Sequence, residues 1–210
     1  MQLLIVDYGL GNMSSLKHAF NVLGVNAVIS SEENKIQSAD AIILPGVGNF
    51  GKATENILSK GLADVIRNSV INEKKPILGI CLGMQLLSSG SEESPNSKGL
   101  GLIPGSVKKI TMPEGCFEKI PQIGWNNVLS INEAPLFQNI SQGSNFYFAN
   151  SYHYVCEKKF VIASTTFGIN MVSSIQHENI FGVQFHPEKS SYNGIKLLNN
   201  FIDYCLKFTN

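Results

Sequence analysis

Cys81 lies in the segment Gly79-Ile80-Cys81-Leu82-Gly83, which follows an apolar run and precedes a stretch of helical character. A cysteine at such a junction sits on a sharp strand-to-helix turn, where flanking glycines leave room for a substrate. The partial positive charge of the helix N-terminus favours thiolate over thiol. The segment therefore predicts a nucleophile elbow that carries cysteine. The alternative is a structural cysteine, because free cysteine is among the most buried residue types.

A nucleophilic thiol needs a general base, and His186 is the best placed of the four histidines, at positions 18, 153, 177 and 186. It follows the apolar run 180–185 and precedes Pro187, which stops the strand. Residues two apart on an extended backbone point the same way, so Glu188 can orient the ring of His186. Cys81, His186 and Glu188 form the predicted catalytic triad. The alternative is that His-Pro-Glu is a polar turn after a core strand.

Acyl transfer to a thiol also requires hydrogen-bond donors for the oxyanion. The backbone N–H of Leu82, directly after the nucleophile, is one candidate. The amides of Val47 and Gly48 are candidates for the second donor, because their glycine-containing loop follows the apolar run 41–44 and can approach closely.

The same loop supports a rival interpretation. The residues 46–51 match the dinucleotide-binding pattern G-x-G-x-x-G after a strand. That pattern also needs an acidic residue about 20 positions later, at the end of the next strand. The chain has Lys74-Lys75 after the intervening helix, and a nucleotide site leaves Cys81 and His186 without a role.

The elements that must position these residues follow from the hydrophobic pattern. Strands are predicted at 3–6, 25–29, 41–44 and 76–80, with amphipathic helices marked by apolar residues at 13–23 and 57–66. Strand-like pieces follow at 101–110, 123–131, 146–155, 161–167 and 172–184, the last with a hairpin turn at 177–179, and a helix over 195–205 ends the chain. We expect an α/β fold with a mixed, mostly parallel central sheet flanked by helices and an antiparallel C-terminal extension. One domain, 1–210, is predicted.

Composition excludes several classes of function. Lys plus Arg (16) equals Asp plus Glu (16), so nothing indicates a nucleic-acid or membrane partner. The first residues lack a signal peptide's basic region, and no apolar run reaches membrane-spanning length. Four scattered cysteines without C-x-x-C argue against zinc and against a disulfide scaffold. We expect a cytoplasmic protein with reduced thiols that needs no metal and no cofactor.

Together these motifs resemble the class I (triad) glutamine amidotransferases, and within them the glutaminase subunits of imidazole glycerol phosphate synthase. The matching segments lie in the family's order along nearly the whole chain: 7–12, 44–50, 79–85, 121–126, 146–148 and 182–190. The resemblance implies that Cys81 attacks the side-chain amide of glutamine, that His186 protonates the leaving amine and then activates water, and that Glu188 orients it.

The resemblance also implies binding residues and a partner. Gln85 and Glu93 are expected to contact glutamine, together with the backbone of Ser151 and Tyr152. The ammonia is expected to pass to a (β/α)₈-barrel cyclase subunit in a heterodimer, which forms imidazole glycerol phosphate and an aminoimidazole carboxamide ribonucleotide in histidine biosynthesis. The expected partner interface includes Trp125, Asn126 and Lys189, although a lone tryptophan in a strand is also typical of a core.

One position departs from the family's pattern, because Asn150 stands where a histidine is expected before Ser151-Tyr152. Two alternatives therefore stay open beside the histidine pathway. A paralogous subunit would supply ammonia for amidino-sugar synthesis on surface glycans, and a scaffold protein would carry a dead site. The complete set Cys81, His186 and Glu188 argues against the second.

Overall fold

The computed structural model describes residues 1–131 and 134–208. Across this part of the chain, eleven strands form one mixed sheet, with the order β2-β1-β3-β4-β11-β10-β9-β6-β7; β8 pairs with β10, and β5 pairs with β8. The parallel strands are short, apolar and mostly buried on both faces, as helices on both sides require. They are β1 (Leu3–Val6), β2 (Ala27–Ser30), β3 (Ala41–Leu44), β4 (Ile77–Ile80) and β11 (Ile180–Val183).

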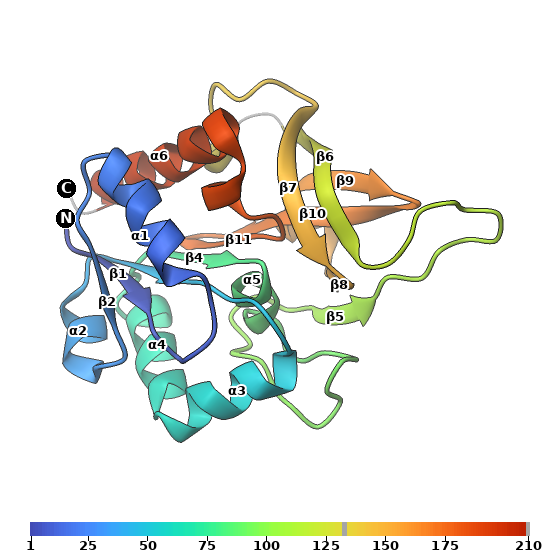
Figure 1. Cartoon of the computed structure of the whole chain (residues 1–210). Helices are drawn as coiled ribbons and strands as arrows, with labels where there is room; N and C mark the ends of the chain where they lie inside the picture. Colours follow the sequence, from blue (N-terminus) through green and yellow to red (C-terminus); the bar gives the residue numbers. More distant parts are fainter. Residues whose placement is uncertain (132–133, 209–210) are drawn as a thin grey trace.

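Helices cover the parallel part of the sheet on both faces (Figure 1). One face carries α1 (Met13–Val22) and α6 (Ser191–Phe208). The other carries α2 (Glu33–Ser38), α3 (Phe50–Ser59), α4 (Leu62–Ile71) and α5 (Leu82–Leu86). Successive strand residues point to opposite faces, so Leu3 and Ile5 pack with the first group and Leu4 and Val6 with the second. The predicted layers are confirmed.

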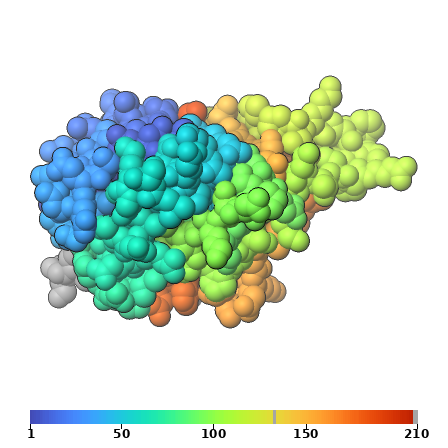
Figure 2. Space-filling view, turned by 90° about the horizontal axis from the view of Figure 1, so that it is seen from below, coloured from blue at the N-terminus to red at the C-terminus, as the bar shows by residue number. Residues whose placement is uncertain are grey.

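The C-terminal half extends the sheet with antiparallel strands, as predicted. These strands lie together to the right in Figure 1. They are β5 (Ser106–Lys109), β6 (Gln122–Ser130), β7 (Ser144–Asn150), β8 (Tyr152–Val155), β9 (Val161–Phe167) and β10 (Ile169–His177). The segment between β5 and β6 projects from the body (Figures 1 and 2).

Apart from shifted bounds, such as those of β2, β5 and α6, three details differ from the sequence prediction. The helix expected around 57–66 is two helices, α3 and α4, because Gly61 between them adopts a left-handed conformation with φ 67° that ends one and starts the other. The piece expected over 146–155 is two strands, β7 and β8, which pair with different neighbours. The short helix α2 was not predicted, because its six residues bury only Ile36 and leave no clear period.

The fold brings three predicted site segments to one edge of the sheet. Strands β3, β4 and β11 are parallel neighbours, so their carboxyl ends lie side by side. The loop 45–49 follows β3, Cys81 follows β4, and residues 184–186 follow β11. In the described ranges, none of the helices combines the length and hydropathy that a bilayer crossing requires.

Candidate active site

Cys81 occupies a strained turn between β4 and α5. It is the N-cap of α5 and has φ 55° and ψ −110°, a conformation that costs a non-glycine residue on the order of 1–3 kcal/mol. Hydrogen bonds hold the strain in place: its N–H donates to the carbonyl of Val183 at 2.8 Å, and its carbonyl accepts from the N–H of Gln85 at 3.1 Å. The side chain is therefore presented at the end of the sheet, as predicted for a nucleophile elbow.

The glycines around Cys81 are required by packing. A Cβ on Gly79 would lie 2.7 Å from the carbonyl oxygen of Gly83, and a Cβ on Gly83 would overlap the carbonyl oxygen of Leu44. Only residues without a side chain allow α5 to lie this close to β3 and β4. The spacing G-x-C-x-G thus sets the position of the thiol.

His186 and Glu188 form a buried pair beside the thiol. The Nδ1 of His186 lies 2.9 Å from Oε1 of Glu188, and the two side chains are 3% and 1% exposed. Glu188 lies in the turn Pro187–Lys189. The N–H of His186 donates to the carbonyl of Tyr147 at 2.8 Å, and its carbonyl accepts from the hydroxyl of Ser190 at 2.6 Å. Hydrogen bonds to the backbone and to Nδ1 therefore fix the position of the imidazole ring.

The pKa of His186 reflects opposing influences. Burial lowers the pKa, whereas hydrogen bonds and charges of Cys81 and Glu188 raise it and outweigh burial, so the pKa is raised overall. The imidazolium form therefore persists at a pH where an ordinary histidine is neutral. Such a group can donate a proton to a leaving amine.

The loop after β3 packs directly against the elbow. A Cβ on Gly46 would lie 2.7 Å from Cβ of Leu82 and 2.9 Å from the N of Gly83. The hydroxyl of Tyr8 donates to the carbonyl of Pro45 at 2.5 Å and anchors this loop. The contact with the elbow therefore explains Gly46 without a dinucleotide site.

A cavity of about 320 Å³ opens over the thiol. Its lining brings together ten of the predicted site residues: Val47, Gly48, Cys81, Leu82, Gln85, Glu93, Ser151, Tyr152, His186 and Lys189. Glu188 does not line it and lies behind the imidazole. Within residues 1–131 and 134–208, no cluster of His, Cys, Asp or Glu could hold a metal ion.

Two side chains in the cavity are held by the protein's own hydrogen bonds. The Nε2 of Gln85 donates to the carbonyl of Tyr152 and to Oε1 of Gln184, both at 3.1 Å. The Oε2 of Glu93 accepts from the N–H of Phe50 at 2.7 Å. Both side chains are pre-positioned, and Glu93 supplies a negative charge suited to an ammonium group.

Asn150, which departs from the family's pattern, also lines the cavity. Its Nδ2 donates to the carbonyl of Tyr152 at 3.1 Å, and it pairs across the strands with Gln122. Among the described residues, neither its Oδ1 nor the amide atoms of Gln122 find a hydrogen-bond partner, although all are buried. Asn150 therefore carries an unsatisfied amide oxygen in the cavity lining.

The predicted interface residues lie at different depths. Trp125 is 53% exposed on β6, so it is not a core residue, and its ring meets Tyr147 edge-on at 6.1 Å. Lys189 lies over the ring of Tyr147, with Nζ 5.7 Å from the centroid. Asn126 faces the other side of the strand, where its Nδ2 donates to the carbonyl of Thr166 at 2.9 Å.

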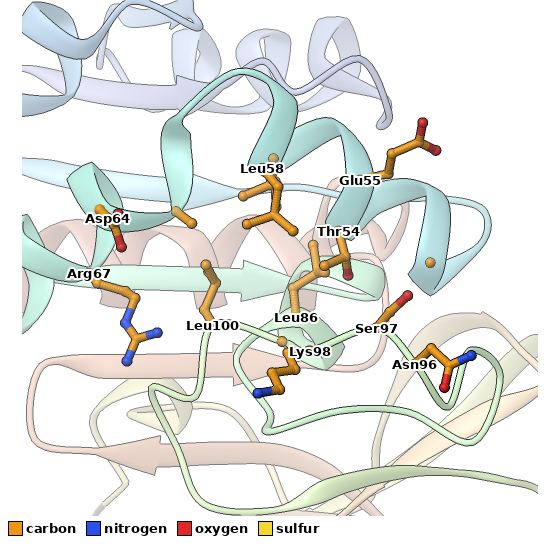
Figure 3. A pocket seen from close by; sticks show the side chains of 14 residues that line it. Thr54, Glu55, Leu58, Asp64, Arg67, Leu86, Asn96, Ser97, Lys98 and Leu100 are labelled. Carbon is orange, nitrogen blue, oxygen red and sulfur yellow. The ribbon is translucent and has the colours of Figure 1, made fainter.

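A second, larger cavity of about 560 Å³ is not lined by Cys81 (Figure 3). It is formed by α3, α4, the end of α5 and residues 96–100, with Leu58, Arg67 and Lys98 among its labelled side chains. None of the predicted site residues lines it. Volume alone therefore does not indicate the reactive site, because the thiol and the imidazole line the smaller cavity.

Residues 4–204 match the family model described as glutamine amidotransferase class-I. The chain belongs to this family. It is 42% identical over 205 residues to imidazole glycerol phosphate synthase subunit HisH 2 of Vibrio vulnificus, covering 97% of this chain and 95% of the relative. It is 48% identical over 202 residues to subunit HisH of Pyrococcus furiosus, covering 95% and 97%.

Solved structures confirm the fold. The chain superposes on a crystal structure of a glutamine amidotransferase with a TM-score of 0.75 at 18% identity, covering 96% of this chain and 98% of the other. It superposes on the structure of PurLQS from Thermotoga maritima with a TM-score of 0.73 at 20% identity, covering 97% and 98%. At these identities the likeness establishes the amidotransferase fold alone.

Three residues that hold the site together were not predicted from the sequence: Tyr8, Gln184 and Ser190. Tyr8 and Ser190 act through backbone carbonyls, which leave no trace in a sequence pattern. Gln184 had a signal, because it stands two residues before His186 on an extended segment and so faces the same edge.

Proposed function

We propose that the chain is a glutaminase subunit that hydrolyses glutamine to glutamate and ammonia for imidazole glycerol phosphate synthesis in histidine biosynthesis. The observation that carries the proposal is the strained Cys81 turn, which shares a cavity with His186 of the buried His186–Glu188 pair in a class-I amidotransferase. Relatives named as imidazole glycerol phosphate synthase subunits, 42% and 48% identical over nearly their full length, support the pathway. We place it in the cytoplasm, as one domain over 1–210.

The triad performs two linked acyl transfers. The Cys81 thiolate attacks the carboxamide carbon, a C–S bond forms, and the C–N electron pair leaves with the nitrogen as His186 donates its proton, so ammonia departs. Water then attacks the glutamyl thioester while His186 accepts a proton from it, and the C–S bond breaks to release glutamate and thiolate. Glu188 holds the imidazole in the tautomer that keeps Nε2 available.

Each tetrahedral intermediate carries an oxyanion. The N–H of Leu82 at the start of α5 is one proposed donor, and the N–H of Val47 or Gly48 is the other. Support comes from Gly46, whose close contact with Leu82 and Gly83 brings the loop 45–48 against the elbow. All three donor residues line the cavity over the thiol.

The remaining cavity residues fit an amino-acid substrate. Glu93, whose carboxylate is fixed by Phe50, is proposed to bind the substrate's ammonium group. Gln85 and the backbone of Ser151 and Tyr152 are proposed to hold the polar groups of glutamine, and they line the same cavity.

We propose that ammonia passes to a (β/α)₈-barrel cyclase in a heterodimer, with Trp125, Asn126 and Lys189 at the interface. Lys189 lines the cavity and lies over the ring of Tyr147, and Tyr147 in turn contacts the exposed Trp125. These contacts connect the cavity to the proposed interface. Ile123, on the same side of β6, is 66% exposed and adds apolar area.

The test is ammonia release from glutamine with the barrel partner and its ligand present. Cys81→Ala is expected to abolish release, whereas Cys156→Ala, at a half-buried thiol outside the cavity, is expected to retain it. Release by Cys81→Ala at the wild-type rate would refute the triad. Rescue of a histidine auxotroph that lacks the subunit tests the pathway, and failure with a matched barrel would favour the paralogous ammonia supplier.

A further inference from the structure

Gln184 is a buried glutamine that contacts both the nucleophile and the proposed substrate-binding Gln85. It follows β11, is 1% exposed, and its backbone N–H donates to the carbonyl of Ser173 at 2.8 Å. Its Nε2 lies 3.7 Å from Sγ of Cys81, within reach of an N–H···S hydrogen bond, and its Oε1 accepts from Gln85 at 3.1 Å. Backbone and side chain are therefore both held.

The orientation of the two amides is dictated by a backbone carbonyl. The oxygen of Tyr152 can only accept, so the Gln85 group 3.1 Å away must be its NH₂. Its second N–H then points to Gln184, which must present its oxygen there. The NH₂ of Gln184 is consequently the end that faces Cys81.

This arrangement leaves one free acceptor and one directed donor. Both N–H groups of Gln85 are used within the protein, so only its Oε1 remains to accept from a ligand in the cavity. The donor from Gln184 meets a sulfur that is negatively charged before it attacks and again when the C–S bond breaks, but neutral in the thioester. A donor fixed there stabilises the charged stages selectively.

We propose that Gln184 donates a hydrogen bond to the Cys81 sulfur during the reaction and holds the Gln85 amide so that its oxygen faces the substrate. This role rests on the proposed glutaminase chemistry, and it adds a residue to the triad and the oxyanion donors. The two contacts separate experimentally, because one acts on the thiolate and the other on substrate binding.

Two variants of similar size test the two contacts. Gln184→Met removes both, so kcat is expected to fall, KM for glutamine to rise, and alkylation of Cys81 by iodoacetamide at neutral pH to slow about tenfold. Gln184→Glu keeps an oxygen for Gln85 but sets a carboxylate against the sulfur. For this variant KM is expected to stay within about threefold of wild type, while kcat falls more than about tenfold and the pH profile of alkylation moves upward.

Ser174→Ala is the matched control, because Ser174 is a fully buried residue of β10 whose hydroxyl has no partner among the described residues. It is expected to match wild type in alkylation and turnover, and thermal unfolding checks every variant. If Gln184→Met does not fold, Gln184→Glu decides. If a folded Gln184 variant is alkylated at the wild-type rate, the proposal for Gln184 is overturned. Alkylation requires no glutamine turnover. If the wild-type protein released no ammonia from glutamine, the glutaminase proposal would be refuted, but the alkylation result for Gln184 would still stand.

Discussion

Replacing Glu188 with glutamine removes one buried negative charge and little else. The carboxylate oxygen lies 2.9 Å from Nδ1 of His186, and both side chains are almost fully buried. At an effective dielectric constant of about 20, opposite unit charges at that distance attract by about 6 kcal/mol. A neutral amide oxygen in the same place retains a hydrogen bond of about 1–1.5 kcal/mol. The imidazolium that donates to the leaving amine therefore loses about 4 kcal/mol of stabilisation, and less of it is present to react, which corresponds to about a thousandfold in rate.

The pH dependence has a defined sign. Contact with Glu188 and Cys81 raises the pKa of His186 against burial, so the protonated form survives to higher pH in the wild type. Without the carboxylate the pKa falls, and the basic limb of the kcat/KM profile is expected to move to lower pH. Stability changes with the same sign: the ion pair stabilises the fold most below the ordinary histidine pKa of about 6.5, and this contribution disappears as pH rises through the raised value.

The assay is glutamate formation with the partner present, measured across pH for wild type and Glu188→Gln. Glu157→Gln serves as the control, because Glu157 is 65% exposed and forms a surface ion pair with Lys159. Its activity is expected to be unchanged. A kcat/KM within about twofold of wild type in a folded Glu188→Gln protein, with an unmoved basic limb, would show that the carboxylate does not act on His186 as argued.

Three further changes have definite expectations. Gly83→Ala drives a Cβ into the carbonyl of Leu44 and is expected to cost more than about 3 kcal/mol in urea unfolding, and a milder loss would contradict the close packing of α5. Tyr8→Phe removes the hydroxyl from the carbonyl of Pro45, so about 1–3 kcal/mol of stability and part of kcat should be lost with little change in KM. Asn179→Ala removes two buried hydrogen bonds to backbone carbonyls far from the thiol; unfolding should show a loss of about 2–4 kcal/mol, and a drop in kcat would mean that the site is not independent of that turn.

The parts of the fold that sequence predicted are those set by local pattern. Apolar runs too short for helices gave β1, β3 and β9 with the bounds that the structure has, and helical spacing located α1 and α6. The break at Gly61 was not predicted, because a glycine inside a helical pattern does not reveal whether it adopts positive φ. The same limit hid the division between β7 and β8, since a continuous apolar stretch does not show where its pairing partner changes.

At the site, the residue types and their local geometry follow from the sequence: a cysteine between glycines at a strand end, and His186 two residues from Glu188. The tertiary structure alone decided that these segments meet, because β4 and β11 become parallel neighbours although about a hundred residues separate them. It also decided that Gln184 faces the sulfur and that Trp125 lies at the surface. Such contacts depend on strand order and register, which are fixed by burial across the whole sheet rather than by any local pattern.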